Sequence, residues 1–148
     1  MPIYDTATPY IACYVLLEKD SRVAFVLRSG TSWMNNYYGL PSGKVEIDET
    51  FTAGAIREAK EEIGVDIKSS DLEPILTVHR KASDGAPYWV DIYFRAKNWE
   101  GEPFNAEPHM HSELAWLDPK QLPDNVIPSV KSALEEIVAG KIYSEFGW

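Results

Sequence analysis

Three glutamates, Glu58, Glu61 and Glu62, are spaced at i, i+3 and i+4, so on a helix they lie on one face within a single turn. Carboxylates this close repel one another, and the helix gains no stability from them. A hard divalent cation such as Mg²⁺ relieves the repulsion, because it takes oxygen ligands and bridges carboxylates to substrate phosphates. The spacing therefore indicates metal-assisted phosphate chemistry, with a solvated acidic face of a surface helix as the alternative.

The residues on the N-terminal side of this cluster suit the same chemistry. Arg57 can bond a neighbouring carboxylate and fix its orientation, and Glu49 is its predicted partner. The loop from Gly39 to Gly43 comes just before the helix. Glycine lets the backbone of this loop pass close to the helix, so a carbonyl oxygen can join the ligands.

The complete segment from Gly43 to Val65 resembles the signature of the Nudix hydrolases. It reads Gly-x5-Glu-x7-Arg-Glu-x2-Glu-Glu-x-Gly, followed by Val65 in the final aliphatic position, and Ala59 stands where a larger aliphatic residue is more usual. Seven fixed identities arise by chance on the order of once in 10⁹ start positions. The resemblance extends over roughly residues 10 to 138, although only this box is highly specific.

The resemblance implies an enzyme that attacks a diphosphate with water and uses Mg²⁺, or alternatively Mn²⁺, as its cofactor. It implies Glu58 and Glu62 as the first metal ligands and Glu61 as a further ligand or the group that orients the water. The backbone carbonyl that completes the ligands in this family corresponds to Ser42 or Gly43, and Ser42 replaces the glycine that is usual there.

The catalytic residues implied by the resemblance are Glu61, Glu58, Arg57 and Glu113. Glu113 enters because family members often supply a late ligand or base from the corresponding region. The resemblance does not decide which glutamate is the base.

Three residues are predicted to contact the substrate. Arg28 can pair phosphate oxygens, although a surface arginine at a strand end explains it equally well. Asn125 lies where some triphosphatases of this family read the base, although an N-cap or turn role fits it at least as well. Tyr38 can stack on a base or simply cover the core. The pair His109 and His111 is predicted to occupy surface or loop positions.

The leading interpretation is hydrolysis of a nucleoside triphosphate or a related nucleoside diphosphate derivative, with oxidised nucleotides as one class of substrate. The first alternative is a hydrolase of a nucleotide sugar or dinucleotide. The second is a Nudix domain that senses a nucleotide without turnover. The intact box disfavours the second alternative, because sensing domains often have a broken one.

The elements that must position these residues are read from hydrophobic periodicity and turn signals. Strands are predicted at 10–17, 22–28, 72–80, 88–97 and 113–117, helices at 50–63 and 127–139, and a long loop at 29–42. Thr50 is the predicted N-cap of the first helix and Gly64 its stop, and Asp84-Gly85 signals a turn. The order favours an α/β (α+β) fold with a mixed sheet. The family resemblance implies an α/β/α sandwich, here as a single domain over 1–148.

Composition limits the partners and the location. The net charge of −9, with 23 acidic against 14 basic residues, disfavours binding to a nucleic-acid polymer, whereas a small nucleotide can approach through a metal ion. The single cysteine, Cys13, excludes an internal disulfide and is predicted to pack in the core. We expect a cytoplasmic protein that does not bind membranes, and a homodimer by analogy with relatives.

Overall fold

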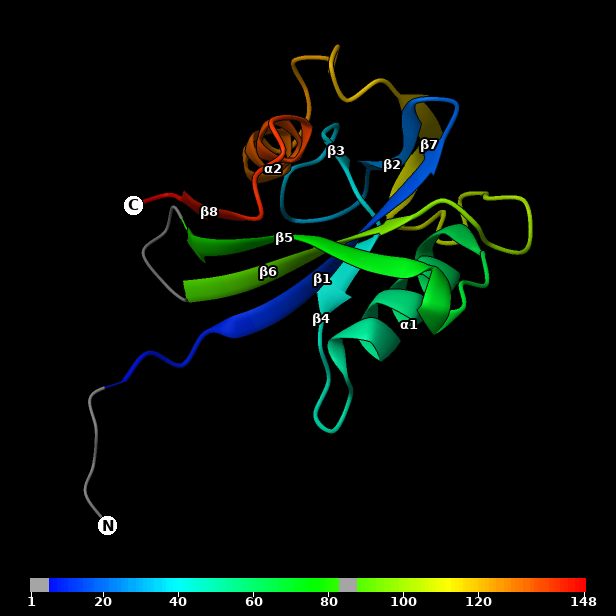
Figure 1. Ribbon diagram of the computed structural model, residues 1–148. Helices are drawn as coiled ribbons and strands as arrows, with labels where there is room; N and C mark the ends of the chain where they lie inside the picture. Colours follow the sequence, from blue (N-terminus) through cyan, green and yellow to red (C-terminus); the bar gives the residue numbers. More distant parts are fainter. Residues whose placement is uncertain (1–5, 83–87) are drawn as a thin grey trace.

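The computed structural model describes residues 6–82 and 88–148 and has a mixed β-sheet with a helix on each side (Figure 1). The elements in chain order are β1 (Tyr10–Lys19), β2 (Arg22–Arg28), β3 (Tyr38–Gly39), β4 (Ser42–Lys44), α1 (Phe51–Ile63), a 3₁₀ turn (Ser69–Asp71), β5 (Leu72–Lys81), β6 (Tyr88–Ala96), β7 (His111–Leu117), α2 (Pro128–Val138) and β8 (Tyr143–Phe146). The predicted mixed-sheet sandwich is confirmed. The predicted turn at Asp84-Gly85 lies outside the described residues. No described helix is long and apolar enough to cross a membrane.

Strand β1 lies at the centre of the sheet and connects its two halves. It pairs in parallel with β6, which is followed by β5 and then β8 at the edge. On its other side it pairs antiparallel with β4, and its end forms a hairpin with β2. Asp20 and Ser21 close this hairpin with φ of 52° and 62°, so both residues of the turn are left-handed. Strands β3 and β7 flank β2.

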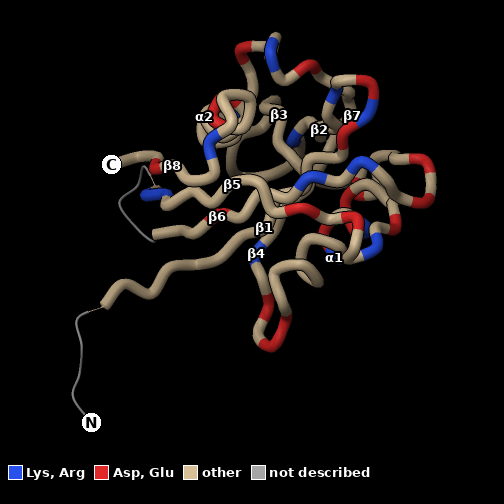
Figure 2. Tube along the Cα trace, in the orientation of Figure 1, with Lys and Arg blue, Asp and Glu red and all other residues tan. Residues whose placement is uncertain are grey.

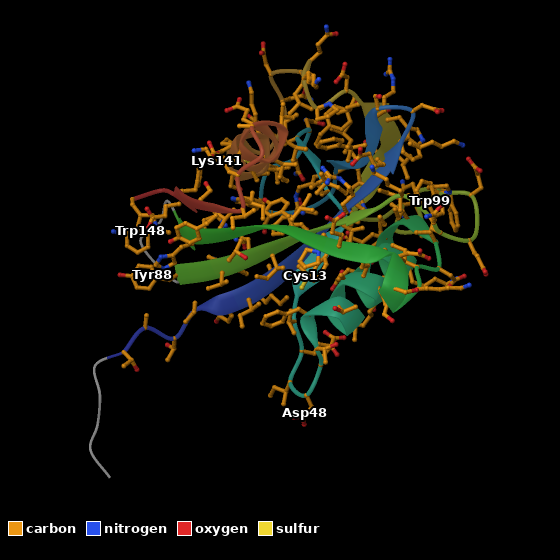
Figure 3. The ribbon with its side chains drawn as sticks, in the orientation of Figure 1. Cys13, Asp48, Tyr88, Trp99, Lys141 and Trp148 are labelled. Carbon is orange, nitrogen blue, oxygen red and sulfur yellow. The ribbon has the colours of Figure 1, made fainter. Side chains whose placement is uncertain are left out.

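The alternation of side chains along β1 separates two cores. Cys13, Val15 and Leu17 pack with the buried side of α1, whereas Leu16 packs with the buried side of α2. Figure 3 places Cys13 between the sheet and α1. Its thiol is fully buried and donates to the Phe51 carbonyl, and burial raises its pKa to about 12. Cys13 is therefore a packing residue, as predicted.

Helix α1 has the ends that the sequence predicts. The Thr50 hydroxyl accepts a hydrogen bond from the Ala53 amide, and Gly64 ends the helix with φ of 71° while its amide bonds the Lys60 carbonyl. Ala59, the smaller residue in the Nudix-like box, is fully buried against the sheet. The two ends and the buried stripe together determine which face of the helix carries the glutamates.

The structure corrects three predictions about the remaining segments. The predicted loop 29–42 contains β3 and the first residue of β4, and both strands are too short to leave a periodic pattern. The unpredicted β8 has only four residues. His111 is wrong as a surface or loop residue, because β7 starts two residues before the predicted strand and His111 is 1% exposed. Burial lowers its pKa to about 4, and within the described residues its Nδ1 has no partner.

The end of α1 provides a test of this architecture. Gly64→Ala should reduce the free energy of unfolding by about 2 kcal/mol, because a side chain is strained at this left-handed φ and its Cβ would overlap the ring of Phe104. Gly140→Ala is the control, because Gly140 has a similar φ of 77° and no described atom within 4 Å of its Cβ position. Urea unfolding should show the smaller loss for Gly140→Ala. Equal losses would contradict a packing role for Phe104 at Gly64.

Candidate active site

Arg57 on α1 connects four carbonyl and carboxylate groups. Its Nε and Nη2 donate to the two oxygens of Glu49 at 2.7 and 3.0 Å, which confirms the predicted pair. Its Nη1 donates to Glu58 at 2.7 Å and lies 3.3 Å from Glu61, and Nη2 also bonds the Lys44 carbonyl. The hydrogen bonds from Arg57 lower the pKa of Glu49 to about 2. The guanidinium therefore joins the loop before α1 to the acidic face of the helix.

Glu58 and Glu62 lie one turn apart and face β4. The Ser42 amide donates to Glu62 Oε2 at 2.6 Å, and a Cβ at Gly43 would overlap the Glu58 carboxylate. Burial raises the pKa of Glu58, an effect that the hydrogen bond from Arg57 opposes, and it raises the pKa of Glu62 well above its usual range. Two carboxylates that are costly to ionise thus lie against β4, Glu58 over Gly43 and Glu62 at the Ser42 amide.

Glu61 differs from these two residues in exposure. Its side chain is 51% exposed, compared with 12% for Glu58. Among the residues that the structure describes, no three carboxylate, imidazole or thiol groups stand at metal-binding distances from one another. Glu58 is held by Arg57 and Glu62 by the Ser42 amide, so a cation would compete with these two donors.

The predictions missed one acidic residue that the structure brings to this site. Glu107 lies in the segment before β7, and its charge further raises the pKa of Glu58 and Glu62. The segment is attached to the end of α1, because the Ala106 amide donates to the Glu62 carbonyl and the Phe104 amide to the Ile63 carbonyl. The available signal was the irregular stretch between β6 and β7, since a loop of that length is often functional.

Arg28 is the one predicted substrate contact that the structure brings close to the box. Its charge lowers the pKa of Glu62, which places the guanidinium within electrostatic range of that carboxylate. Its Nε donates to the Trp33 carbonyl at 3.1 Å, and the guanidinium lies 5.3 Å from the centre of the Trp33 ring. Arg28 therefore adds a positive charge beside the acidic face of α1.

The other predicted residues gather at a second place, on β3, β7 and the segment before α2. The Tyr38 hydroxyl donates to the Glu113 carboxylate, which raises the pKa of Tyr38. The Tyr38 amide donates to the Asn125 carbonyl, and the Asn125 side chain donates to the Asn36 carbonyl at 2.8 Å. Glu113 is therefore bound to Tyr38. The acidic residue from the second half of the chain that lies beside α1 is instead Glu107.

The donors at the box suit a hard divalent cation. Glu58 and Glu62 present carboxylate oxygens on one helical face, and burial disfavours their charged forms and raises the pKa of each, as expected for groups whose charge a cation would offset. Figure 2 shows acidic residues along α1 and in the loop that connects it to β4. Arg28 gives this acidic region a positive group that an anionic substrate could contact.

The pairing of Arg57 with Glu49 predicts a pH dependence of stability. Glu49→Gln should lower the free energy of unfolding by about 1 kcal/mol at pH 7, because the ionised partner of Arg57 is lost. The folded-state pKa of Glu49 lies near 2 rather than its ordinary 4.5, so this contribution is present above pH 4.5 and is lost as the pH falls towards 2. Urea unfolding should show the gap between variant and wild type closing over that range.

The exposed Glu135→Gln on α2 controls for the loss of one negative charge. A gap for Glu49→Gln that stays constant from pH 7 to about 2.5 would contradict a role for the ionised Glu49 carboxylate.

Comparison with known proteins agrees with this geometry. An 8-oxo-dGTP diphosphatase from Proteus vulgaris is 35% identical over 68 residues, which are 46% of this chain and 61% of that protein. The chain thus aligns with less than two thirds of that relative. The crystal structure of a MutT NUDIX hydrolase from Burkholderia pseudomallei is 26% identical, with a TM-score of 0.78, and the match covers 86% of this chain and 97% of that one.

A further solved structure shares the fold at lower identity. The solution structure of the E. coli ORF135 protein has a TM-score of 0.76 at 21% identity, and the match covers 93% of this chain and 94% of that one. The NUDIX domain family matches residues 7–139, which include the whole box from Gly43 to Val65 as well as β7 and α2. The chain therefore belongs to the Nudix hydrolase family.

Proposed function

We propose that this protein hydrolyses a diphosphate bond in a nucleoside triphosphate or a related nucleoside diphosphate derivative, and that it depends on Mg²⁺. The observation that carries the proposal is the pair Glu58 and Glu62, which are desolvated one turn apart against the Ser42–Gly43 backbone. The similarity to an 8-oxo-dGTP diphosphatase supports the substrate class and favours oxidised purine triphosphates within it.

The residues that would hold the cation are the three glutamates of α1 and the adjoining backbone of β4. Glu58 and Glu62 offer the desolvated carboxylates, Glu61 offers an exposed one, and a carbonyl of Ser42 or Gly43 completes the ligands. Mg²⁺, or Mn²⁺ in its place, would polarise the phosphoryl oxygens and lower the pKa of a bound water. Arg57 keeps Glu58 oriented, because one guanidinium holds both Glu58 and the preceding loop.

The attacking water needs a carboxylate that accepts its proton. Glu61 is exposed on the acidic face, and Glu107 lies close enough to act on the charges of Glu58 and Glu62. Glu61 or Glu107 therefore orients the water, and Glu113, which binds Tyr38, is left for another role. Arg28, whose charge acts on Glu62, contacts the substrate phosphates. Tyr38 and Asn125 contact the nucleoside.

The reaction should require a divalent cation. EDTA is expected to abolish turnover and added Mg²⁺ to restore it, because the carboxylates of α1 alone repel a polyphosphate. The assay is release of phosphate or pyrophosphate from a panel of canonical and oxidised triphosphates, ADP-ribose, dinucleoside polyphosphates and nucleotide sugars. Turnover that survives full chelation would refute the metal mechanism. Turnover of nucleotide sugars or dinucleotides without turnover of any triphosphate would refute triphosphates as the substrate class, and tight binding without any turnover would show a sensor.

Glu62→Gln should reduce kcat by about 10³-fold, on the scale of losing one preorganised charge-stabilising group. Its thermal midpoint should be equal to or above that of the wild type, because the variant buries a neutral amide in place of a costly carboxylate. Glu135→Gln, on the exposed side of α2, should change neither quantity. Near-normal turnover in Glu62→Gln would show that this carboxylate does not hold the metal.

A further inference from the structure

A polar pair lies on the face of the sheet opposite the carboxylate box. Leu27 of β2 is directly opposite Tyr38 of β3 on one side and Glu113 of β7 on the other, so the three side chains share one face. Phe25 and Val23, two and four residues earlier in β2, pack on the α2 side of the sheet. Alternation therefore places Tyr38 and Glu113 on the α2 side, beyond the start of that helix.

The backbone around Tyr38 holds its hydroxyl in a defined place. The Tyr38 amide donates to the Asn125 carbonyl at 2.7 Å, and the Tyr38 carbonyl accepts from the Ile127 amide at 3.0 Å. Strand β3 is thus clamped between β2 and the segment that leads into α2. The hydroxyl then donates to Oε1 of Glu113, whose side chain is exposed. This restricts the rotation of a glutamate that would otherwise be free in solvent.

The restrained carboxylate keeps most of its accepting capacity. A carboxylate has two oxygens with about four lone-pair sites and no hydrogen to donate when ionised. Within the described residues, the Tyr38 hydroxyl is its one hydrogen-bond partner. Oε2 and the second lone pair of Oε1 are therefore available to a ligand that presents two adjacent donors.

The pair and Arg28 lie at the same end of β2. Leu27 directly precedes Arg28, whose charge acts on Glu62, and Tyr38 comes four residues before Ser42, whose amide bonds Glu62. The strands of the pair, β3 and β7, therefore flank the end of β2 from which the charge of Arg28 acts on the box. A nucleotide with its phosphates beside Arg28 can place its base across this end of the sheet, beside Glu113.

Bases differ in the donors that they present on their pairing edge. Guanine presents an N1–H and an N2 amino group side by side, and its 8-oxo form keeps both. Adenine presents one amino group beside an accepting ring nitrogen, and this acceptor would face a carboxylate oxygen and be repelled. Glu113 therefore matches a guanine-type edge and mismatches an adenine-type edge.

We propose that Glu113, oriented by Tyr38, is a specificity-determining residue that accepts two hydrogen bonds from the pairing edge of a guanine-type base. This rests on the proposed function, because it assigns the base of the same substrate. It gives Glu113 a role other than that of a late metal ligand or catalytic base.

The test compares guanine with adenine nucleotides in Glu113→Gln. An amide offers one acceptor and one donor, so the ratio of kcat/KM for dGTP to that for dATP should fall by about 10- to 100-fold, the scale of one bidentate base contact. Tyr38→Phe keeps the ring and loses the hydroxyl, and it should lower the same ratio by about 3- to 10-fold, mainly through KM for dGTP. Glu73→Gln, an exposed glutamate on β5, is the control and should leave the ratio unchanged.

Binding of GMP and AMP without metal separates this proposal from the proposed hydrolysis. Glu113→Gln should weaken GMP binding relative to AMP even if no nucleotide is turned over, in which case the proposed function alone would fail. A uniform loss of kcat for dGTP and dATP with an unchanged ratio would overturn the proposal and return Glu113 to catalysis. An unchanged ratio with normal kcat would overturn it as well.

Discussion

The burial of two carboxylates one helical turn apart is the constraint on which the rest of this site depends. Removing an ionised carboxylate from water costs several kcal/mol unless fixed partners compensate it. Arg57 compensates Glu58 and the Ser42 amide compensates Glu62, and each needs a particular backbone nearby. A side chain at Gly43 would overlap the Glu58 carboxylate and displace it from its place beside Arg57. Each carboxylate therefore depends on a donor that the chain itself supplies, and the proposed divalent cation would replace these donors.

The two faces of the sheet carry different functional groups. The α1 side carries the acidic box, and the small Ala59 lets the helix lie directly on the strands. The α2 side carries the pair Tyr38 and Glu113, which the clamped β3 holds in place. Strand β2 connects both, since Leu27 lies beside that pair and Arg28 beside Glu62. A substrate that is charged at one end and aromatic at the other matches this division.

The parts that follow repetitive physical rules were predictable from sequence. The caps Thr50 and Gly64, the buried stripe of α1 and the pair Arg57–Glu49 all follow from helical spacing and side-chain chemistry, and the structure contains them. Strands of two to four residues left no periodic pattern, so β3 and β8 were missed. Glu107 was missed for a related reason, because tertiary hydrogen bonds to the end of α1 bring it to the box from an irregular segment.

The box was predictable from sequence and the contacts outside it were not, and this difference has a physical cause. Metal ligation needs several like charges close together, and one helix turn can provide them from local sequence alone. Reading a base needs donors and acceptors placed at particular points of an edge, and the residues proposed to contact it, Tyr38, Glu113 and Asn125, are far apart in the sequence and meet only in the fold. A single substitution on such a surface can change which base fits it while the box stays intact. The box is thus encoded in a contiguous motif, whereas the proposed base contacts depend on how the sheet brings distant residues together.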